Sequence, residues 1–287
     1  MFQYARPASL GEALALLEEV PDARLLSGGT DLLVGVRKGT VRPPLVIDLK
    51  RVLELAPGIE QTDTTLRISA MTVLSDVIAD VRIRTHVPAL VDAALVVGSI
   101  QIRNRATLAG NVCNASPAAD TASPLLVYDA LAEIVGSTGV RRIALADFFL
   151  GPGRTALRPG ELVSAIELPV PMAPRGAAFG RMTRRRGVDL ATVNLCCSVS
   201  ASGETRFAFG AVGPRPFLVT DASGTLADAA GEQEAQDAVL REMTAQATPI
   251  SNVRASREYR QEMLLVLSRR ALETARQRLR EARNAGG

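Results

Sequence analysis

Two adjacent glycines in the segment LLSGGTDLL have the position and the chemistry to bind an anion. They follow a predicted strand at 24–27 and precede a predicted helix at 31–38, so the chain must turn sharply there. Consecutive N–H groups at such a turn, with the positive end of a helix dipole behind them, favour phosphate oxygens. A pair of glycines at a strand end is also common in plain turns, so the spacing alone leaves both interpretations open. The candidate ligands are Leu25, Leu26, Ser27, Gly28, Gly29, Thr30, Asp31 and Leu32.

A second segment, ATLAGNVCNASPAAD at 106–120, is unusually poor in bulky side chains. Gly110 lies between short residues, which permits a ligand to approach the backbone closely. Asp120 offers a carboxylate that could accept hydrogen bonds from a ribose hydroxyl or an adenine amine. The alternative is a polar, glycine-bearing surface loop. The candidates here are Thr107, Leu108, Ala109, Gly110, Asn111, Asn114 and Asp120.

The sequence lacks the patterns of a catalytic or metal-binding site. The three cysteines form no CxxC pair, and His86 is the one histidine. These counts exclude an iron–sulfur ligand set and an HExxH zinc site, and they leave a Ser-His-Asp triad only as a remote option. The segment GPGRTA at 151–156 matches the dinucleotide-binding pattern GxGxxA in sequence. That site requires a helix directly after the glycines, and Pro152 and Pro159 prevent one from forming there. We therefore assign no catalytic residue and no metal ligand.

The composition indicates a globular protein of about two domains, with 287 residues, 47% of them hydrophobic and 22% charged. The formal net charge of +3 rests on arginine, and no aromatic residues interleave with the basic ones, so nucleic-acid binding is not expected. No apolar run approaches the roughly 18 residues of a membrane span. The start of the sequence lacks the regions of a signal peptide, so we expect a cytoplasmic protein.

Hydrophobic periodicity and capping residues predict a chain of mixed helices and strands. Ser9 and Glu12 form a capping box ahead of a first helix, and a strand at 45–49 completes a small α/β subdomain. A strand at 66–69 and a helix capped by Thr72 come next. The remaining expected elements are a helix at 88–97, an irregular segment at 99–120 with too many small and polar residues for a buried helix, apolar elements at 125–131, 132–135 and 142–145, and a strand at 162–168.

A run of prolines and turn residues between 169 and 176 marks the expected domain boundary. We expect one domain at 1–174, with subdomains at about 1–56 and 57–174, and a second domain at 175–287. The second domain should contain paired strands at 195–199 and 205–212 and helices at 228–246 and 257–282. One face of the last helix is apolar, formed by Leu264, Leu267, Ala271, Ala275 and Leu279.

Together, the two small-residue segments resemble the pyrophosphate loops of the FAD-binding subunits of molybdenum hydroxylases, the xanthine dehydrogenase and carbon monoxide dehydrogenase flavoprotein family. The resemblance extends through GELVSAIELPVP, RRRGVDLATVN and SREYRQEMLLVLSRRAL, so it covers essentially the whole chain. It implies an α+β fold. A two-subdomain FAD-binding fold of the vanillyl alcohol oxidase (PCMH) type would be followed by a C-terminal α+β domain like that of the carbon monoxide dehydrogenase flavoprotein.

The resemblance also implies roles for individual residues. The backbone amides of Leu25–Leu32 and Thr107–Asn111 would hold the FAD pyrophosphate, and Asp120 would engage the adenosine part. Leu162 or Val163 would touch the isoalloxazine ring.

One position departs from the family pattern. Many relatives carry a lysine directly after the aromatic residue that matches Phe179, and this lysine helps to hold the flavin. Here Gly180 and Arg181 follow Phe179, which makes Arg181 the candidate substitute. An arginine fork is bulkier than a lysine and cannot be deprotonated.

The family likeness implies that the chain works with partners. FAD would couple an iron–sulfur centre to NAD, a quinone or oxygen. A large molybdenum cofactor subunit would oxidise the substrate and a small 2Fe-2S subunit would pass on the electrons, in an assembly expected to be a dimer of heterotrimers. Two other interpretations are a free-standing flavin oxidase of the same fold, disfavoured by the scarcity of His, Tyr and Trp, and a nucleotide-binding assembly module without redox turnover.

Overall fold

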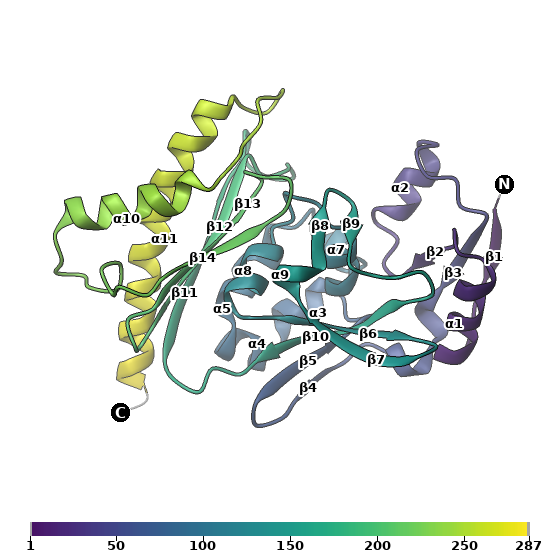
Figure 1. Cartoon of the computed structure of the whole chain (residues 1–287). Coiled ribbons are helices and arrows are strands. Elements are labelled where there is room, and N and C mark those ends of the chain that lie inside the picture. Colours follow the sequence, from purple (N-terminus) through teal and green to yellow (C-terminus); the bar gives the residue numbers. More distant parts are fainter. Residues whose placement is uncertain (1, 286–287) are drawn as a thin grey trace.

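The first part of the chain forms a small parallel sheet in the computed structural model, which describes residues 2–285 (Figure 1). Both outer strands pair with β3, and the strands span Gln3–Ala5 (β1), Arg24–Leu26 (β2) and Leu45–Asp48 (β3). Helix α1 (Leu10–Glu19) begins as predicted, because Ser9 Oγ accepts the Glu12 N–H at 3.2 Å. The Glu12 carboxylate in turn accepts the Ala8 N–H at 2.8 Å. Helix α2 follows the glycine turn, and two 3-10 turns follow β3; these elements span Leu32–Arg37 (α2), Leu49–Arg51 (η1) and Leu53–Leu55 (η2).

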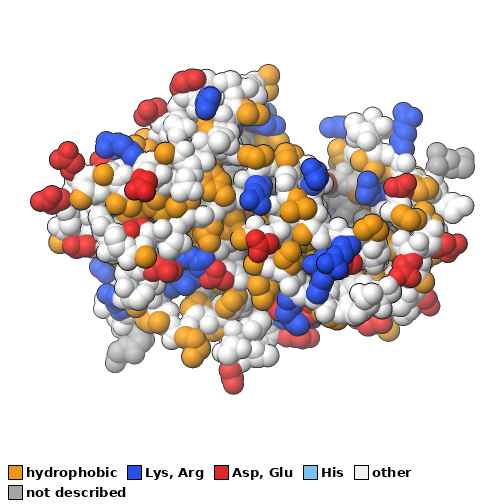
Figure 2. All heavy atoms as spheres, in the orientation of Figure 1, with side chains coloured by type: hydrophobic (Ala, Val, Ile, Leu, Met, Phe, Trp, Pro, Cys, Tyr) orange, Lys and Arg blue, Asp and Glu red, His pale blue; other side chains and the backbone are white. Residues whose placement is uncertain are grey.

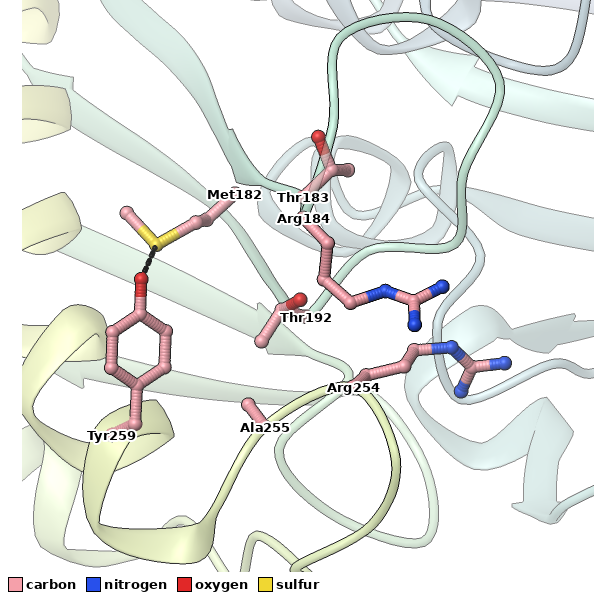
Figure 3. Close-up of a pocket in the computed structure, with 7 residues that line it drawn as sticks. All are labelled: Met182, Thr183, Arg184, Thr192, Arg254, Ala255 and Tyr259. Carbon is pink, nitrogen blue, oxygen red and sulfur yellow. Dashed lines mark hydrogen bonds between the residues drawn. The ribbon is translucent and has the colours of Figure 1, made fainter.

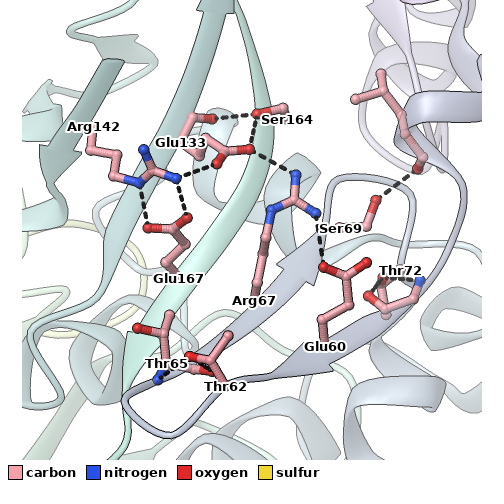
Figure 4. Close-up of polar contacts among 12 residues, drawn as sticks. Glu60, Thr62, Thr65, Arg67, Ser69, Thr72, Glu133, Arg142, Ser164 and Glu167 are labelled. Carbon is pink, nitrogen blue, oxygen red and sulfur yellow. Dashed lines mark hydrogen bonds and ion pairs between the residues drawn. The ribbon is translucent and has the colours of Figure 1, made fainter. Parts of the chain in front are cut away.

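A five-stranded antiparallel sheet in the order β4-β5-β10-β6-β7 forms the next layer. Its strands span Ile59–Gln61 (β4), Thr65–Ser69 (β5), Leu131–Gly136 (β6), Gly139–Ala144 (β7) and Leu162–Pro169 (β10), and a separate hairpin spans Phe149–Gly151 (β8) and Arg154–Thr155 (β9). A chain of ion pairs crosses this sheet (Figure 4). Glu133 accepts hydrogen bonds from Arg67 at 2.7 Å and from Arg142 at 2.8 Å, and Arg142 also binds Glu167. These cross-strand pairs satisfy two carboxylates that are nearly buried.

Seven short helices complete this part of the chain, and two predictions about them were wrong. They span Leu74–Ala79 (α3), Val81–His86 (α4), Pro88–Leu95 (α5), Ile100–Arg103 (α6), Leu108–Cys113 (α7), Ala122–Val127 (α8) and Leu145–Phe148 (α9). Thr72 does not cap α3, because its hydroxyl donates to the Gly58 carbonyl and accepts the Gly58 N–H instead. The segment at 99–120 is not purely irregular. Side-chain caps at Ser99 and Thr107 start α6 and α7, and small neighbours let α7 bury Leu108 and Val112.

The C-terminal part is an antiparallel sheet in the order β11-β12-β13-β14, covered on one face by α10 and α11 (Figure 1). Its elements span Arg175–Met182 (β11), Val193–Ser200 (β12), Thr205–Gly210 (β13), Phe217–Asp221 (β14), Gln233–Ala245 (α10) and Arg257–Ala285 (α11). Strands β11 and β14 were not predicted, since turn signals around them masked their pattern. Helix α10 starts later than predicted, because the Asp228 side chain accepts the Ala230 N–H and closes a turn there. The predicted apolar face of α11 is buried in a core with β12 and β13.

Candidate functional site

The two glycine segments lie against each other, although they are far apart in the sequence. The Thr107 hydroxyl donates to Ser27 Oγ at 3.3 Å and accepts the Gly110 N–H at 3.0 Å. A Cβ at Gly28 would lie 2.1 Å from the carbonyl oxygen of Arg105, so the two backbones are in direct contact. Packing and hydrogen bonding therefore join the turn after β2 to the start of α7 in one cradle, formed by residues 27–31 and 107–111.

Several backbone N–H groups of this cradle make no hydrogen bond within residues 2–285. Within residues 2–285, the N–H groups of Gly28, Gly29, Thr30 and Asp31 donate to no protein acceptor. Gly28, Gly29 and Thr30 are half-buried, and Asp31 is exposed. A run of unpaired amides at a turn is a concave donor site for an anion. Figure 2 shows the surface hollowed between the N-terminal lobe and the part of the molecule that carries β8 and β9.

Two positions in the cradle require glycine in this conformation. Gly29 has a φ of +78°, in the left-handed region that side chains strain to adopt. A Cβ at Gly110 would come within 2.8 Å of Thr107 Oγ1 and 3.0 Å of Ser27 Oγ. A side chain at Gly110 would therefore collide with the cradle itself, in addition to blocking the close approach of a ligand.

Asp120 faces the C-terminal domain. Its carboxylate is 3.2 Å from Arg181 Nε and 3.5 Å from Asn194 Nδ2. Burial raises the pKa of Asp120 to about 7, even though Arg181 and Asn194 act to lower it. Two predicted site residues, Asp120 and Arg181, are therefore neighbours across the two domains.

Arg181 is held by both domains. It donates to the Val96 carbonyl at 3.1 Å and to the Asp189 carbonyl, while its buried Nε is ion-paired with the Asp120 carboxylate at 3.2 Å. It lines a cavity of about 390 Å³ together with Val96 and Gly98 of the N-terminal domain and Arg186 of the C-terminal domain. The Arg181–Asp120 ion pair thus lies between the two domains, next to this cavity.

The other predicted residues occupy different environments. Leu26, Leu108 and Ala109 are buried, so only their backbone can meet a ligand, while Leu25, Leu32 and Asn111 are half-buried and Asn114 is exposed. Asn111 accepts a hydrogen bond from Thr121 at 2.6 Å, which orients its side chain. Leu162 and Val163 lie within β10, 0% and 5% exposed, so their contact with a flavin ring stays a prediction.

Sequence reasoning missed Asn194, which no local motif marks. This fully buried residue of β12 lies against Asp120 and accepts a hydrogen bond from Ser123. A Cβ at Gly210, on the adjacent strand β13, would lie 2.2 Å from Asn194 Oδ1, so Gly210 makes room for the amide. The one available signal was its place at the end of RRRGVDLATVN.

Residues 2–285 contain no group of three or more His, Cys, Asp or Glu side chains arranged to hold a metal ion. None of the helices described there is both long and apolar enough to cross a membrane.

Comparison with known proteins matches both halves of the chain to one kind of flavoprotein. Residues 1–171 match the FAD binding domain in molybdopterin dehydrogenase, and residues 177–275 match the CO dehydrogenase flavoprotein C-terminal domain. The chain is 32% identical over 277 residues to the putative xanthine dehydrogenase FAD-binding subunit of Escherichia coli (strain K12), covering 95% of each. It is 32% identical to the carbon monoxide dehydrogenase medium chain of Afipia carboxidovorans, covering 96% of this chain and 97% of that one.

A solved structure shows the same fold. Reconstituted CO dehydrogenase from Oligotropha carboxidovorans contains a chain that superposes with a TM-score of 0.90 at 31% identity, over 97% of this chain and 98% of that one. The predicted fold class and the predicted oxidoreductase family are thereby confirmed. The chain belongs to the family of FAD-binding medium subunits of molybdenum hydroxylases, the flavoproteins of the xanthine dehydrogenase and carbon monoxide dehydrogenase type.

Proposed function

We propose that this chain binds FAD in the cradle of residues 27–31 and 107–111 and relays electrons from a partner's iron–sulfur centre to NAD, a quinone or oxygen. The observation that supports it most is the run of four amides without a protein acceptor in residues 2–285, at 28–31. FAD, when bound, can accept electrons singly and pass on two.

Different residues of the site would bind different parts of FAD. The amides at 28–31 would hold the pyrophosphate, with the backbone of Thr107–Asn111 closing the other side. Asp120 would accept hydrogen bonds from the adenosine part, and Arg181 would help to hold the flavin from across the domain boundary. The side chains of Leu26, Leu108 and Ala109 are buried and would exclude water from beneath the phosphates.

We also propose how the chain is divided into domains, which subunits it binds and where it is located. The domains would span 1–174 and 175–287, with subdomains at about 1–56 and 57–174; β11 begins at Arg175, where the first domain would end. The partners would be a large molybdenum cofactor subunit and a small 2Fe-2S subunit, assembled as a dimer of heterotrimers in the cytoplasm. Support comes from the relatives named as subunits or medium chains of dehydrogenases.

Replacing Gly29 by valine tests the cradle. We expect Gly29→Val to lose FAD, because its φ of +78° disfavours any side chain and a Cβ would lie 2.8 Å from Leu26 Cδ1. Visible flavin absorbance per folded chain is the measurement, with circular dichroism to confirm folding. Gly58→Val is the matched control, since a Cβ there meets nothing within 4 Å. Stoichiometric flavin on a folded Gly29→Val chain would refute the cradle assignment.

A further inference from the structure

A cavity of about 360 Å³ opens in the C-terminal domain, away from the glycine cradle. It lies where the end of β11 and the start of β12 meet the segment that leads into α11 (Figure 3). Its volume is within the range of small-molecule sites, about 300–1,000 Å³. The side chains that matter here are Arg184, Thr192, Arg254 and Tyr259.

The walls of this cavity carry more positive than negative charge. The Arg254 side chain makes no hydrogen bond or ion pair with any residue in 2–285, although it is half-buried. Arg184 is paired with Asp189, at 3.2 Å. Figure 3 shows the guanidinium groups of Arg184 and Arg254 at the same end of the cavity, away from Tyr259. One guanidinium at that end thus lacks a counter-charge among the described residues.

A third arginine lies buried behind the cavity wall. Arg260 is 3% exposed, and its guanidinium donates to the Thr192 carbonyl at 2.6 Å, the Ala211 carbonyl at 3.1 Å and Asn252 Oδ1 at 2.9 Å. All three acceptors are neutral, and no carboxylate pairs with Arg260 in residues 2–285. Burial and then Arg254 lower the pKa of Arg260. An anion in the cavity would offset this buried charge, which is otherwise costly.

The hydroxyl of Thr192 provides an independent sign of a missing ligand. Thr192 is 2% exposed and lines the cavity, and its Oγ1 has no hydrogen-bond partner within residues 2–285. Buried polar atoms are nearly always paired, so an orphaned hydroxyl beside a cavity indicates a group that the cavity accepts. Helix α11 starts at Arg257, next to this wall, and its positive end favours an anion.

We propose that this cavity binds a phosphate or pyrophosphate group, with Arg254 and Arg184 clamping its oxygens and the Thr192 hydroxyl donating to one of them. Arginine forks match the geometry of phosphate oxygens, and the hydroxyl adds a further hydrogen-bond donor. The group is either a free inorganic anion or the phosphate portion of a nucleotide. The site uses none of the residues of the glycine cradle, so it stands whether or not that cradle holds FAD.

The test is calorimetric titration of the purified FAD-loaded chain with inorganic phosphate, pyrophosphate and ADP, at constant ionic strength set with sodium chloride. We expect saturable binding of one pyrophosphate per chain. Arg254→Gln should weaken it about tenfold or more, because a charge-assisted hydrogen bond is lost. Arg241→Gln, an exposed arginine of α10 outside the cavity, should bind as the native chain does. Tighter binding of ADP than of pyrophosphate would identify a nucleotide occupant, and equal binding a free anion.

A second variant separates ligand binding from folding. Thr192→Val removes the unpartnered hydroxyl but keeps the backbone carbonyl that accepts from Arg260. We expect an unchanged or higher melting temperature, because no hydrogen bond of the free chain is lost. We also expect pyrophosphate affinity to fall several-fold. Absence of saturable binding by the native chain, or native affinity in both Arg254→Gln and Thr192→Val, would overturn the proposal.

Discussion

Asp120 shows how one residue can couple cofactor binding to pH. Its carboxyl group is 7% exposed and has Arg181 and Asn194 beside it. Burial raises its pKa to about 7, so the group takes up a proton near neutrality when no ligand is bound. A ribose or adenine donor binds the carboxylate form, so protons and FAD should compete for Asp120.

This competition predicts the direction of a pH effect. FAD affinity of the native chain should fall as the pH drops from about one unit above to about one unit below 7, where Asp120 becomes protonated. Asp120→Asn should weaken FAD by about ten- to a hundredfold above that value, since a charge-assisted bond is worth about 1.5–3 kcal/mol. The Asp120→Asn substitution should also remove the change in FAD affinity that occurs near pH 7. Flavin-fluorescence titration is the measurement.

Asp63→Asn is the control for that experiment, because Asp63 is exposed and its side chain makes no hydrogen bond with residues 2–285. Unchanged FAD affinity in Asp120→Asn would show that Asp120 does not contact the cofactor.

At the scale of elements, the C-terminal domain depends on close contact between α11 and β11. A Cβ at Gly176 would lie 1.9 Å from the Ala275 carbonyl oxygen and 2.4 Å from the Leu279 N atom. Both are backbone atoms of a long helix and cannot move independently. Glycine therefore sets the distance at which the helix packs on the strand, and α11 can bury its apolar face there.

Gly176→Ala should destabilise the chain by about 3 kcal/mol, the upper end of the usual cost of overpacking. The measurement is chemical denaturation followed by circular dichroism. Gly11→Ala in α1 is the matched control: a Cβ there meets nothing within 4 Å, and alanine favours a helix, so stability should be equal or higher. An unfolding midpoint for Gly176→Ala equal to that of the native chain would show that helix and strand can separate without cost.

At the scale of the whole molecule, arginines from the C-terminal domain hold it against the first. Arg175 and Arg206 both donate to the Val127 carbonyl at the end of α8, at 3.0 and 3.2 Å. Arg278 of α11 binds Asp92 of α5 at 2.7 Å. Cations at the carboxyl end of a helix complement its dipole. Together with the Arg181–Asp120 pair, on which the proposed flavin site depends, these contacts join the two domains.

The relay proposal makes a prediction about the chain isolated from partners. It should bind FAD and have that flavin bleached by dithionite, because reduction needs only an accessible cofactor. It should not oxidise the substrate of the complex, because the proposed relay places that step on the molybdenum cofactor subunit. Adding the molybdenum and iron–sulfur subunits should restore bleaching by substrate, followed by visible absorbance. Turnover by the isolated chain at the rate of the whole complex would instead indicate a free-standing oxidase.

The sequence by itself determined features that depend on neighbouring residues. The Ser9 cap on Glu12, strand β10 and the apolar face of α11 all follow from local spacing, and each is present. The Glu12 half of the predicted capping box differs, because its carboxylate accepts the Ala8 N–H rather than the Ser9 N–H. The two small-residue segments were also identifiable, because glycine and other short residues mark places where a backbone must be approached closely.

Tertiary structure decided what those segments do together. Only packing shows that Thr107 meets Ser27 across 80 residues, that Asp120 faces Arg181, and that Leu162 is buried in a sheet. It also decided that turn-rich segments become β11 and β14, because edge and neighbouring strands gain their stability from partners rather than from their own pattern. The hydrophobic pattern of a segment indicates which side of its own helix or strand each residue occupies. Contacts between elements depend on residues far apart in the sequence, so a short stretch of sequence does not reveal them.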